Sequence, residues 1–370
     1  MNIELLEQIL KENNQPKFRL GQIIKAVYQD GVSSFLEISN LPKDLREILN
    51  KEIKILSFEA EKVLVSENKD SIKALLKLED GNKIETVLIS PKPGVWSACI
   101  SCQVGCPMNC EFCATGSGGF KRNLTAEEIS DQVLFWKTQT PPVLANAKTT
   151  SPLKGEVGRG LKISNIVYMG MGEPFLNWEE VRESLKILTD PKGMNFGSRS
   201  ISVSTVGIPG GMEKLTRDFP QINLAISLHF ADDKKREKFM PANKNLNLEK
   251  LKNELEKYFE KSNRKVFLEY ILFSKINDSE KDMRDLIKYI KSFRKQHLLH
   301  VNLIKYNPVG NNQETRSNNQ KITKTNKFIS SSSEQAIKFR NYLLQNKINC
   351  TIRKSLGTDI QGACGQLAQH

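Results

Sequence analysis

Three cysteines lie within one short segment, Cys106-Pro-Met-Asn-Cys110-Glu-Phe-Cys113, in a Cys-x3-Cys-x2-Cys pattern. Three thiolates at this spacing can hold one compact inorganic cofactor. A cubane iron–sulfur cluster normally takes four cysteines, so three would leave one iron open to a small molecule. The pattern therefore predicts one [4Fe–4S] cluster, bound by Cys106, Cys110 and Cys113.

Zinc is the competing interpretation of these cysteines. Cys99 and Cys102 form one Cys-x2-Cys pair, and Cys110 and Cys113 form another. Zinc ribbons usually place roughly 15–20 residues between such pairs, and here the pairs are much closer together. Cys106 would also be left without a function, so the spacing favours the cluster over zinc.

Small polar residues follow several predicted strands. Gly170-Met-Gly172-Glu173-Pro174 comes after a strand at 163–169, and its glycines allow a ligand to approach the backbone. Glu173 offers a carboxylate to an ammonium group. Single residues of this kind are usually turn, capping or structural residues. Their joint placement at strand ends nevertheless favours a ligand site, with these candidates: Gly172, Glu173, Ser204, Ser227, Leu228, His229 and Asn307.

A seventh cysteine, Cys364, lies in the polar, turn-like segment Asp359-Ile-Gln-Gly-Ala-Cys364-Gly. A structural cysteine would normally lie in an apolar run. The sequence therefore predicts an exposed thiol that is suited to nucleophilic chemistry.

Strands and helices alternate from residue 95 onward, which predicts a parallel sheet with helices outside it. The predicted strands lie at 96–101, 163–169, 200–206, 223–228, 265–272 and 300–306. Six β/α units are too few to close an eight-stranded barrel, so we predict an α/β fold with an open, partial (βα)6 barrel. Catalytic residues in such folds lie at the C-terminal ends of the strands, where these motifs are found.

The N-terminal part of the chain has a different pattern. Residues 1–52 predict a helical accessory domain, with helices at about 3–10, 20–29 and 42–49. Residues 53–94 predict a β-hairpin extension, with strands at 72–78 and 83–89. The core is predicted at 95–340, with mobile insertions at 138–160 and 311–333, and a C-terminal segment at 341–370 carries Cys364.

The composition points to an anionic partner and a reducing compartment. The chain has 370 residues, a formal charge of +13 and seven cysteines. An odd, clustered set of cysteines argues against a secreted disulfide framework. We find no signal peptide and no apolar run of about 20 residues, so we predict a cytoplasmic protein without a membrane span. The positive charge suggests nucleic acid, although a lysine-rich genome would give the same excess.

Taken together, the motifs resemble the RlmN/Cfr family of radical S-adenosylmethionine (SAM) RNA adenosine methyltransferases. The resemblance runs from about residue 80 to the C-terminus and rests on these segments: Cys99-Ile-Ser-Cys-Gln-Val-Gly-Cys106, the cysteine triplet, Arg122-Asn-Leu-Thr, Gly170-Met-Gly-Glu-Pro, Ser227-Leu-His and Ala363-Cys364-Gly-Gln-Leu. It implies that SAM binds the open iron and is cleaved to a 5′-deoxyadenosyl radical.

The same resemblance implies roles for three further residues. Cys364 would first accept a methyl group from one SAM, and a second SAM would generate the radical that activates this methyl for addition to adenine. Cys99 would then form a transient disulfide with Cys364 and release the base. Glu85 matches the proton acceptor of the family, although a hairpin glutamate could equally face water. Cys102 and Cys350 depart from the family pattern, and we interpret both as buried, spare thiols.

The chemistry is consistent with these roles. Carbon 2 of adenine is not nucleophilic, so direct transfer from a sulfonium is unfavourable, and a covalent carrier needs a second thiol for release. The base must also leave its stack, so we expect an extruded nucleotide held by a basic N-terminal unit.

The resemblance implies 23S ribosomal RNA and tRNA as substrates, a flavodoxin-type electron donor and a monomer. Methylation of adenine carbon 2 is the leading hypothesis, and Pro174 and Val104 favour it over carbon 8. A zinc-knuckle RNA-binding protein is the alternative from another class, but it leaves Cys364 unexplained.

Overall fold

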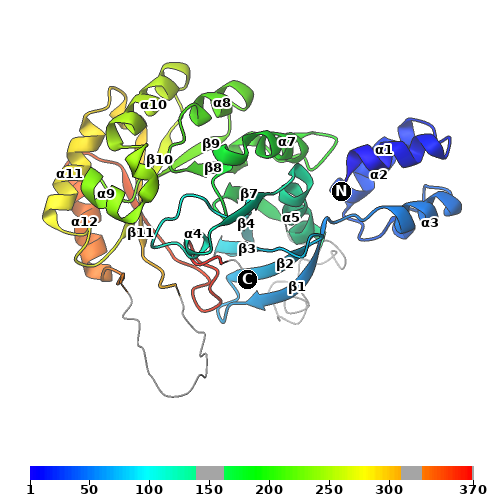
Figure 1. Cartoon of the computed structure of the whole chain (residues 1–370), viewed down its shortest axis with the longest axis horizontal. Helices are drawn as coiled ribbons and strands as arrows, with labels where there is room; N and C mark the ends of the chain where they lie inside the picture. The colour runs from blue at the N-terminus through cyan, green and yellow to red at the C-terminus, as the bar shows by residue number, and fades with distance from the viewer. Residues whose placement is uncertain (139–161, 310–326, 369–370) are drawn as a thin grey trace, which may run out of the picture.

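The computed structural model describes residues 1–138, 162–309 and 327–368. Within these ranges, ten strands form one open sheet in the order β1-β2-β3-β4-β7-β8-β9-β10-β11-β12. Figure 1 shows the helices that follow the parallel strands on the outer side of this curved sheet. A separate two-stranded ribbon pairs β5 (Gln103–Gly105) with β6 (Phe120–Asn123) beside the cysteine loop.

The parallel part of the sheet runs from β4 to β12 and confirms the predicted partial barrel. All six predicted strands are present within two residues of their predicted ends. The elements follow in this order: β4 (Val95–Cys99), α5 (Ala126–Thr138), β7 (Ile163–Tyr168), α7 (Trp178–Thr189), β8 (Ile201–Thr205), α8 (Gly211–Asp218), β9 (Asn223–Ser227), α9 (Asp233–Phe239), α10 (Leu248–Lys261), β10 (Val266–Leu272), α11 (Glu280–Lys291), β11 (Leu299–Lys305), α12 (Ser333–Gln345) and β12 (Cys350–Arg353).

Strand β12 was not predicted, and it adds a seventh parallel strand to the six expected. It has four residues, Cys350-Thr-Ile-Arg353, which are too few to show a clear period of two. Pairing with β11 decides its conformation, and this pairing brings Arg353 to the same end of the sheet as the other functional candidates.

A capping box starts the first barrel helix. The backbone N–H of Glu128 donates to the Thr125 hydroxyl at 3.2 Å, and the Glu128 carboxylate accepts from the Thr125 N–H at 3.0 Å. Arg122 donates to the same carboxylate at 2.7 Å. The Arg122-Asn-Leu-Thr motif therefore fixes the start of α5 behind the cysteine loop.

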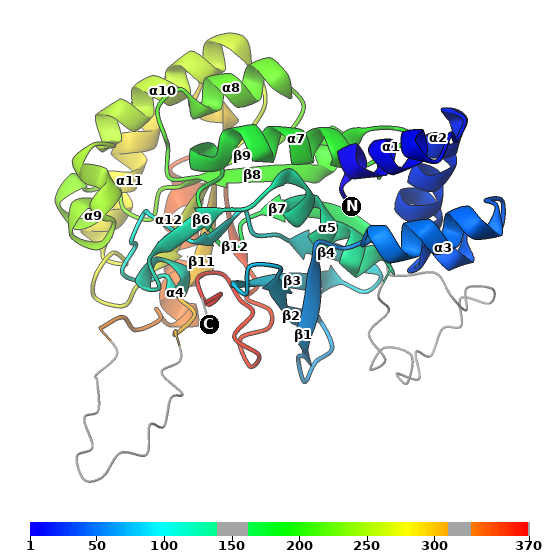
Figure 2. The same cartoon turned by 45° about the vertical axis from the view of Figure 1, so that its right-hand side comes forward.

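The N-terminal helices lie beyond β1 and α5, at one end of the molecule (Figure 2). They are α1 (Ile3–Glu12), α2 (Phe18–Lys25) with a π-turn at Ala26–Asp30, and α3 (Lys43–Glu52). The second helical stretch ends at Gly31, which adopts a left-handed φ of 74°. The Met1 amino group contacts the buried Asp131 carboxylate of α5 at 2.6 Å, which ties this unit to the barrel.

The predicted hairpin is the central part of an antiparallel three-stranded unit. Strands β2 (Ser71–Leu78) and β3 (Lys83–Lys92) form it, and the unpredicted β1 (Phe58–Val65) pairs along β2. Because β3 pairs with β4, this unit continues the barrel sheet. The Cys364 thiol and the hairpin thus belong to elements that meet at one face of the molecule.

Most residues of the two predicted insertions, 138–160 and 311–333, lie outside the described residues. The end of the second is described, and there one side chain packs against the barrel. Phe328 is buried, and its ring lies 6.2 Å from that of Phe112. No helix in the described ranges is long and apolar enough to cross a bilayer.

Candidate active site

The cysteine loop is shaped by its own backbone. The Cys106 N–H donates to the Gly119 carbonyl at 2.8 Å, and the Cys113 N–H donates to the Cys110 carbonyl at 3.1 Å. Gly105 has a φ of 77°, and a Cβ there would lie 1.9 Å from the Gly119 oxygen, so glycine is required. The loop therefore turns sharply between β5 and the short helix α4 (Ala114–Ser117).

Phe112 anchors this loop to the barrel. Its side chain is 4% exposed, and its ring centroid lies 5.2 Å from the rings of both His229 and Phe273. Aromatic contacts of this kind add to the hydrophobic stabilisation of the burial itself. The aromatic residue before the last cysteine thus holds the three thiols against the ends of β9 and β10.

The three cysteines share the wall of a cavity of about 160 Å³. We call it the strand-end cavity, because the ends of β7, β8 and β9 form its other wall. The predicted ligand residues that line it are Gly172, Glu173, Ser204, Ser227 and His229. Among the described residues, no three Cys, His, Asp or Glu side chains converge on one metal ion. Three thiolates of a [4Fe–4S] cluster each bind a different iron, so they need not converge on one ion.

Burial keeps the free thiols protonated. It raises the pKa of Cys106 to about 12, and it raises the pKa of Cys110 as well. A buried thiol loses its proton when a cation takes its place, so these side chains suit a metal cluster better than free thiolate chemistry.

Glu173 is held by the protein itself. Its carboxylate accepts hydrogen bonds from the N–H groups of Phe175 at 3.2 Å and Val206 at 2.9 Å. Burial raises its pKa to about 7. This carboxylate therefore organises the Gly-Glu-Pro loop as well as facing the cavity.

Glu269 of β10 faces the same cavity and was not predicted. One carboxylate oxygen accepts from the Asn302 amide at 2.9 Å and lies 3.6 Å from the Arg353 guanidinium. The other oxygen is buried and has no hydrogen-bond partner in the described part of the chain. A buried acceptor without a partner is unfavourable, so it fits a cavity whose ligand supplies a donor.

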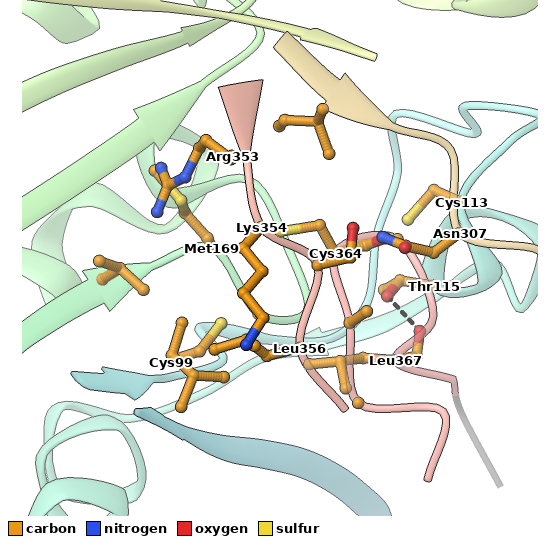
Figure 3. Close-up of a pocket in the computed structure, with 18 residues that line it drawn as sticks. Cys99, Cys113, Thr115, Met169, Asn307, Arg353, Lys354, Leu356, Cys364 and Leu367 are labelled. Atoms are coloured by element: carbon orange, nitrogen blue, oxygen red, sulfur yellow. Dashed lines mark hydrogen bonds between the residues drawn. The ribbon is translucent and has the colours of Figure 1, made fainter. Parts of the chain in front are cut away.

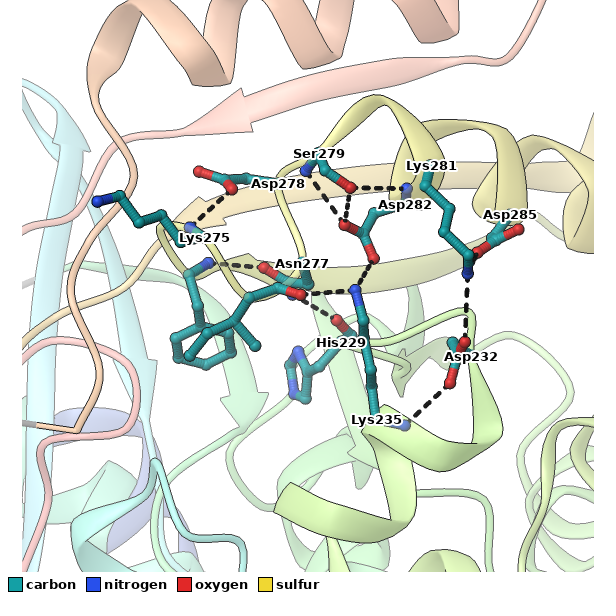
Figure 4. A network of polar contacts seen from close by, with 12 residues as sticks. His229, Asp232, Lys235, Lys275, Asn277, Asp278, Ser279, Lys281, Asp282 and Asp285 are labelled. Atoms are coloured by element: carbon teal, nitrogen blue, oxygen red, sulfur yellow. Dashed lines mark hydrogen bonds and ion pairs between the residues drawn. The ribbon is translucent and has the colours of Figure 1, made fainter.

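His229 and Leu228 have different environments, although they are neighbours. The His229 Nδ1 accepts from the Ile271 N–H at 3.3 Å, and burial lowers the pKa of the ring to about 3, so it is neutral. Asn277 supports this position by donating to the His229 carbonyl at 2.8 Å (Figure 4). Leu228 is fully buried. It lines neither the strand-end cavity nor the second cavity described below, so its predicted ligand contact has no support in this geometry.

A second cavity, of about 110 Å³, brings Cys99 and Cys364 together. We call it the C-terminal cavity, because residues 353–367 supply much of its wall (Figure 3). Cys99 comes from the end of β4, and Cys364 is exposed, as predicted. All seven cysteines are free thiols. Asn307 lines this second cavity instead of the first and donates to the Cys364 carbonyl at 3.1 Å.

The two cavities meet at Cys364. Both linings include Cys113, Arg353 and Cys364, so one thiol borders the cysteine loop on one side and Cys99 on the other. Cys102 and Cys350 are buried and line neither cavity, as expected for spare thiols.

The alternative interpretation of Glu85, a hairpin glutamate that faces water, is wrong. It is 2% exposed and forms an ion pair with Lys73 at 2.8 Å. Its other oxygen accepts from the Ala368 N–H at 2.9 Å. Neither cavity is lined by Glu85.

Comparisons with known proteins agree with this geometry. The sequence model of the Radical SAM superfamily matches residues 100–287, and that of the Ribosomal RNA large subunit methyltransferase N-terminal domain matches residues 1–55. The probable dual-specificity RNA methyltransferase RlmN of Alkaliphilus metalliredigens is 38% identical, over 99% of this chain and 93% of its own length. This chain belongs to the RlmN/Cfr family of radical SAM RNA methyltransferases.

Two further relatives support the family at the level of sequence and fold. The ribosomal RNA large subunit methyltransferase Cfr of Bacillus velezensis is 35% identical, over 98% of this chain and 95% of its own length. The crystal structure of a radical SAM methyltransferase from Sphaerobacter thermophilus is 34% identical and superposes with a TM-score of 0.83, covering 99% of this chain and 97% of the other. Membership implies a [4Fe–4S] cluster, SAM and an RNA substrate.

The sequence-based prediction missed two charged residues that line the strand-end cavity, Glu269 and Arg353. Each is a single charge inside a short strand that is otherwise mostly apolar or uncharged, Val266-Phe-Leu-Glu269-Tyr-Ile-Leu and Cys350-Thr-Ile-Arg353. Strand β10 is mostly buried, and a charge in a buried strand is rare unless it is paired, so that rarity was the available signal for Glu269. Arg353 is exposed, and no comparable signal marked it.

Proposed function

We propose that this protein methylates carbon 2 of an adenine in 23S ribosomal RNA and of the adenosine next to the anticodon in tRNA. The observation that carries the proposal is the position of Cys364, whose thiol borders both cavities. A methyl carrier must meet its donor on one side and its acceptor on the other. Two cysteines, Cys113 and Cys364, line both cavities, and Cys364 is the exposed one that is not assigned to the cluster.

In this proposal the strand-end cavity takes the cofactors. Cys106, Cys110 and Cys113 would hold one cluster, and the polar wall of Gly172, Glu173, Ser204, Ser227 and His229 would hold SAM, with Glu269 as an additional acceptor. The bound cluster and SAM supply a 5′-deoxyadenosyl radical.

Cys364 carries the methyl group. Its sulfur forms a carbon–sulfur bond with the methyl of one SAM, S-adenosylhomocysteine leaves, and the thiol proton is lost. A second SAM is spent in removing one hydrogen atom from that methyl, so each turnover uses two SAM molecules. The methylene carbon on Cys364 then bonds to the ring carbon of adenine, which would lie in the C-terminal cavity.

Cys99 releases the product. The radical formed on the adenine ring would return one electron to the cluster held by Cys106, Cys110 and Cys113. A disulfide then forms between Cys99 and Cys364 as the carbon–sulfur bond of the carrier breaks, and a proton from solvent completes the new methyl group. An external reductant later restores both thiols. The hydrogen on the adenine carbon must leave as a proton, and the family resemblance assigns that step to Glu85. Since Glu85 is paired with Lys73, this assignment stays a prediction and requires the pair to open.

The choice of carbon 2 over carbon 8 rests on sequence. Relatives named RlmN and Cfr both match nearly the whole chain, and Pro174 and Val104 favour the carbon-2 branch. Both are buried and line neither cavity, Pro174 at the start of a 3-10 turn and Val104 in β5. We also propose tRNA as a second substrate, a flavodoxin-type electron donor, a monomer and a cytoplasmic location, as the resemblance implies.

The surface that holds RNA differs from our sequence-based expectation. The N-terminal unit at 1–55 contains eight Lys and Arg and eight Asp and Glu residues, so it is not basic. The excess positive charge lies in the barrel and the C-terminal segment, which include Arg353 and Lys354 at the wall of the C-terminal cavity. We therefore place phosphate contacts near that cavity opening as well as on the helical unit.

Mass spectrometry of nucleosides from treated RNA tests the proposal. Purified enzyme, reductant and SAM act on 23S ribosomal RNA and on tRNA from cells that lack the modification. 2-Methyladenosine in both RNAs supports the proposal. 8-Methyladenosine in ribosomal RNA alone would assign the carbon-8 reaction instead, and unmethylated RNA with both substrates would contradict the function.

A further inference from the structure

A buried ion pair lies between the hairpin and the C-terminal segment. Lys73 of β2 and Glu85 of β3 are diagonal neighbours across the antiparallel pair, since Leu75 is opposite Glu85 and Lys73 is opposite Val87. Their side chains are 9% and 2% exposed, and their charged atoms are 2.8 Å apart. An ion pair this buried is unusual in a hairpin and needs further polar partners.

Both partners find these additional contacts on the segment that carries Cys364. The Lys73 ammonium donates to the Gln361 carbonyl at 3.2 Å. The second oxygen of Glu85 accepts from the Ala368 N–H at 2.9 Å. One ion pair therefore holds both ends of residues 361–368, with Cys364 near the middle.

The middle of the segment is held from the opposite side. The Ala114 N–H donates to the Gly365 carbonyl at 2.8 Å, and the Thr115 hydroxyl donates to the Leu367 carbonyl at 2.6 Å. Both donors follow directly after the cysteine loop. Residues 361–368 thus bridge the hairpin and the cysteine loop, and the ion pair controls one of the two supports.

We propose that Lys73 is a positioning residue that, through its pair with Glu85, sets the place of Cys364 between the two cavities. The inference rests on the proposed carrier function of Cys364. Glu85 holds the segment through the same carboxylate that the family resemblance assigns to proton transfer. Proton transfer by Glu85 would then require its release from Lys73 and Ala368, which would also free the Cys364 segment.

Two substitutions at Lys73 distinguish the effect of its charge from the effect of its side-chain shape. Lys73→Met keeps an unbranched side chain of similar length and removes the charge, whereas Lys73→Arg keeps the charge. Lys235→Met is the matched control, because it removes another lysine that pairs with a buried aspartate, Asp282, on α9 and α11 (Figure 4). That pair has no hydrogen bond to residues 361–368 within the described chain.

The first measurement is hydrogen exchange of the cluster-containing enzyme, followed by mass spectrometry of the peptide that covers 361–368. We expect exchange of this peptide to rise about tenfold in Lys73→Met, to stay near wild type in Lys73→Arg and to change less than about twofold in Lys235→Met. Unchanged exchange in Lys73→Met would overturn the proposal. A rise spread over the whole chain would reduce Lys73 to a general stabilising residue and would also contradict it.

The second measurement is the ratio of methylated RNA to 5′-deoxyadenosine. A displaced carrier would let SAM cleavage continue without methyl transfer, so we expect the ratio to fall about tenfold in Lys73→Met. An unchanged ratio together with increased exchange would show that the pair does not position Cys364. If Lys73→Met does not fold, Ala368→Pro removes the N–H that Glu85 accepts and keeps the ion pair, and it should give the same two changes.

The carrier function is tested separately, by Cys364→Ala. Full methylation by that variant would contradict the proposed function, while the exchange result would still report on the ion pair. The two failures are therefore distinguishable.

Discussion

The two cavities are built in different ways. The strand-end cavity is formed by the cysteine loop and by the ends of neighbouring parallel strands, so the sheet itself places its side chains. The C-terminal cavity depends on a segment without regular structure, residues 354–368, which is held by Asn307, Thr115, Lys73 and Glu85 from three other regions. The cofactor site is thus part of the scaffold, and the carrier site is an attached segment held to it by a few hydrogen bonds.

This difference suits the chemistry of the family. A cofactor must be held rigidly so that its reactive atom points in one direction. A carrier thiol must approach a methyl donor, an RNA base and a second thiol in turn, which requires a segment whose supports can be released. Substitutions on the two sides should therefore have different effects.

The largest effect should come from the cysteine loop. Cys106→Ala should abolish cluster binding and all methylation, because two thiolates cannot hold the cluster. Iron and sulfide analysis of protein purified without oxygen should fall from about four of each per chain to near zero. Cys102→Ser is the control and should keep its iron, since Cys102 lines neither cavity. Zinc in place of iron in the wild type would contradict the radical mechanism.

The next effect separates two thiols that are close in sequence. Cys99→Ser should lower turnover by at least about a hundredfold and leave enzyme covalently linked to RNA, because the second thiol is needed for release. Denaturing gels with labelled RNA would detect the linked species. Cys102→Ser should show none, and equal trapping in both variants would overturn the assignment of Cys99.

A smaller effect is expected from Glu269. Its buried oxygen without a partner faces the strand-end cavity, and a hydrogen bond to a charged group contributes about 1.5–3 kcal/mol. Glu269→Gln should therefore weaken SAM binding about tenfold or more, measured by equilibrium dialysis with the cluster-loaded enzyme. Unchanged affinity with unchanged stability would show that no donor of SAM reaches this oxygen.

The smallest effect concerns His229 and pH. Burial lowers its pKa from 6.5 to about 3, so the folded state excludes a proton that the unfolded state binds below pH 6.5. Stability from the neutral ring is present above pH 6.5 and is lost as the pH falls toward 3. From pH 7.5 to 5.8, wild type should lose about 1 kcal/mol relative to His229→Asn in denaturant unfolding. Equal losses of unfolding free energy in wild type and in His229→Asn would mean that His229 can be charged in the folded protein.

Local sequence was sufficient for much of the fold and for the cofactor half of the site. The spacing of Cys106, Cys110 and Cys113 is fixed by the covalent chain, and capping residues such as Thr125 and Glu128 act within one turn of helix. The long apolar strands of the barrel show their period directly in the sequence. These features depend on neighbours along the chain, so the sequence by itself determined them.

Tertiary structure alone decided the carrier half. Residues far apart in sequence, Cys99, Asn307 and Cys364, meet at one cavity because β4, β11 and the C-terminal segment end at the same face. The contact between Glu85 and Ala368 joins positions 283 residues apart. Burial and hydrogen bonding of such charges depend on the packing of the whole chain, and no local pattern encodes it. The sequence thus determined which groups are present, and folding decided which of them can act together.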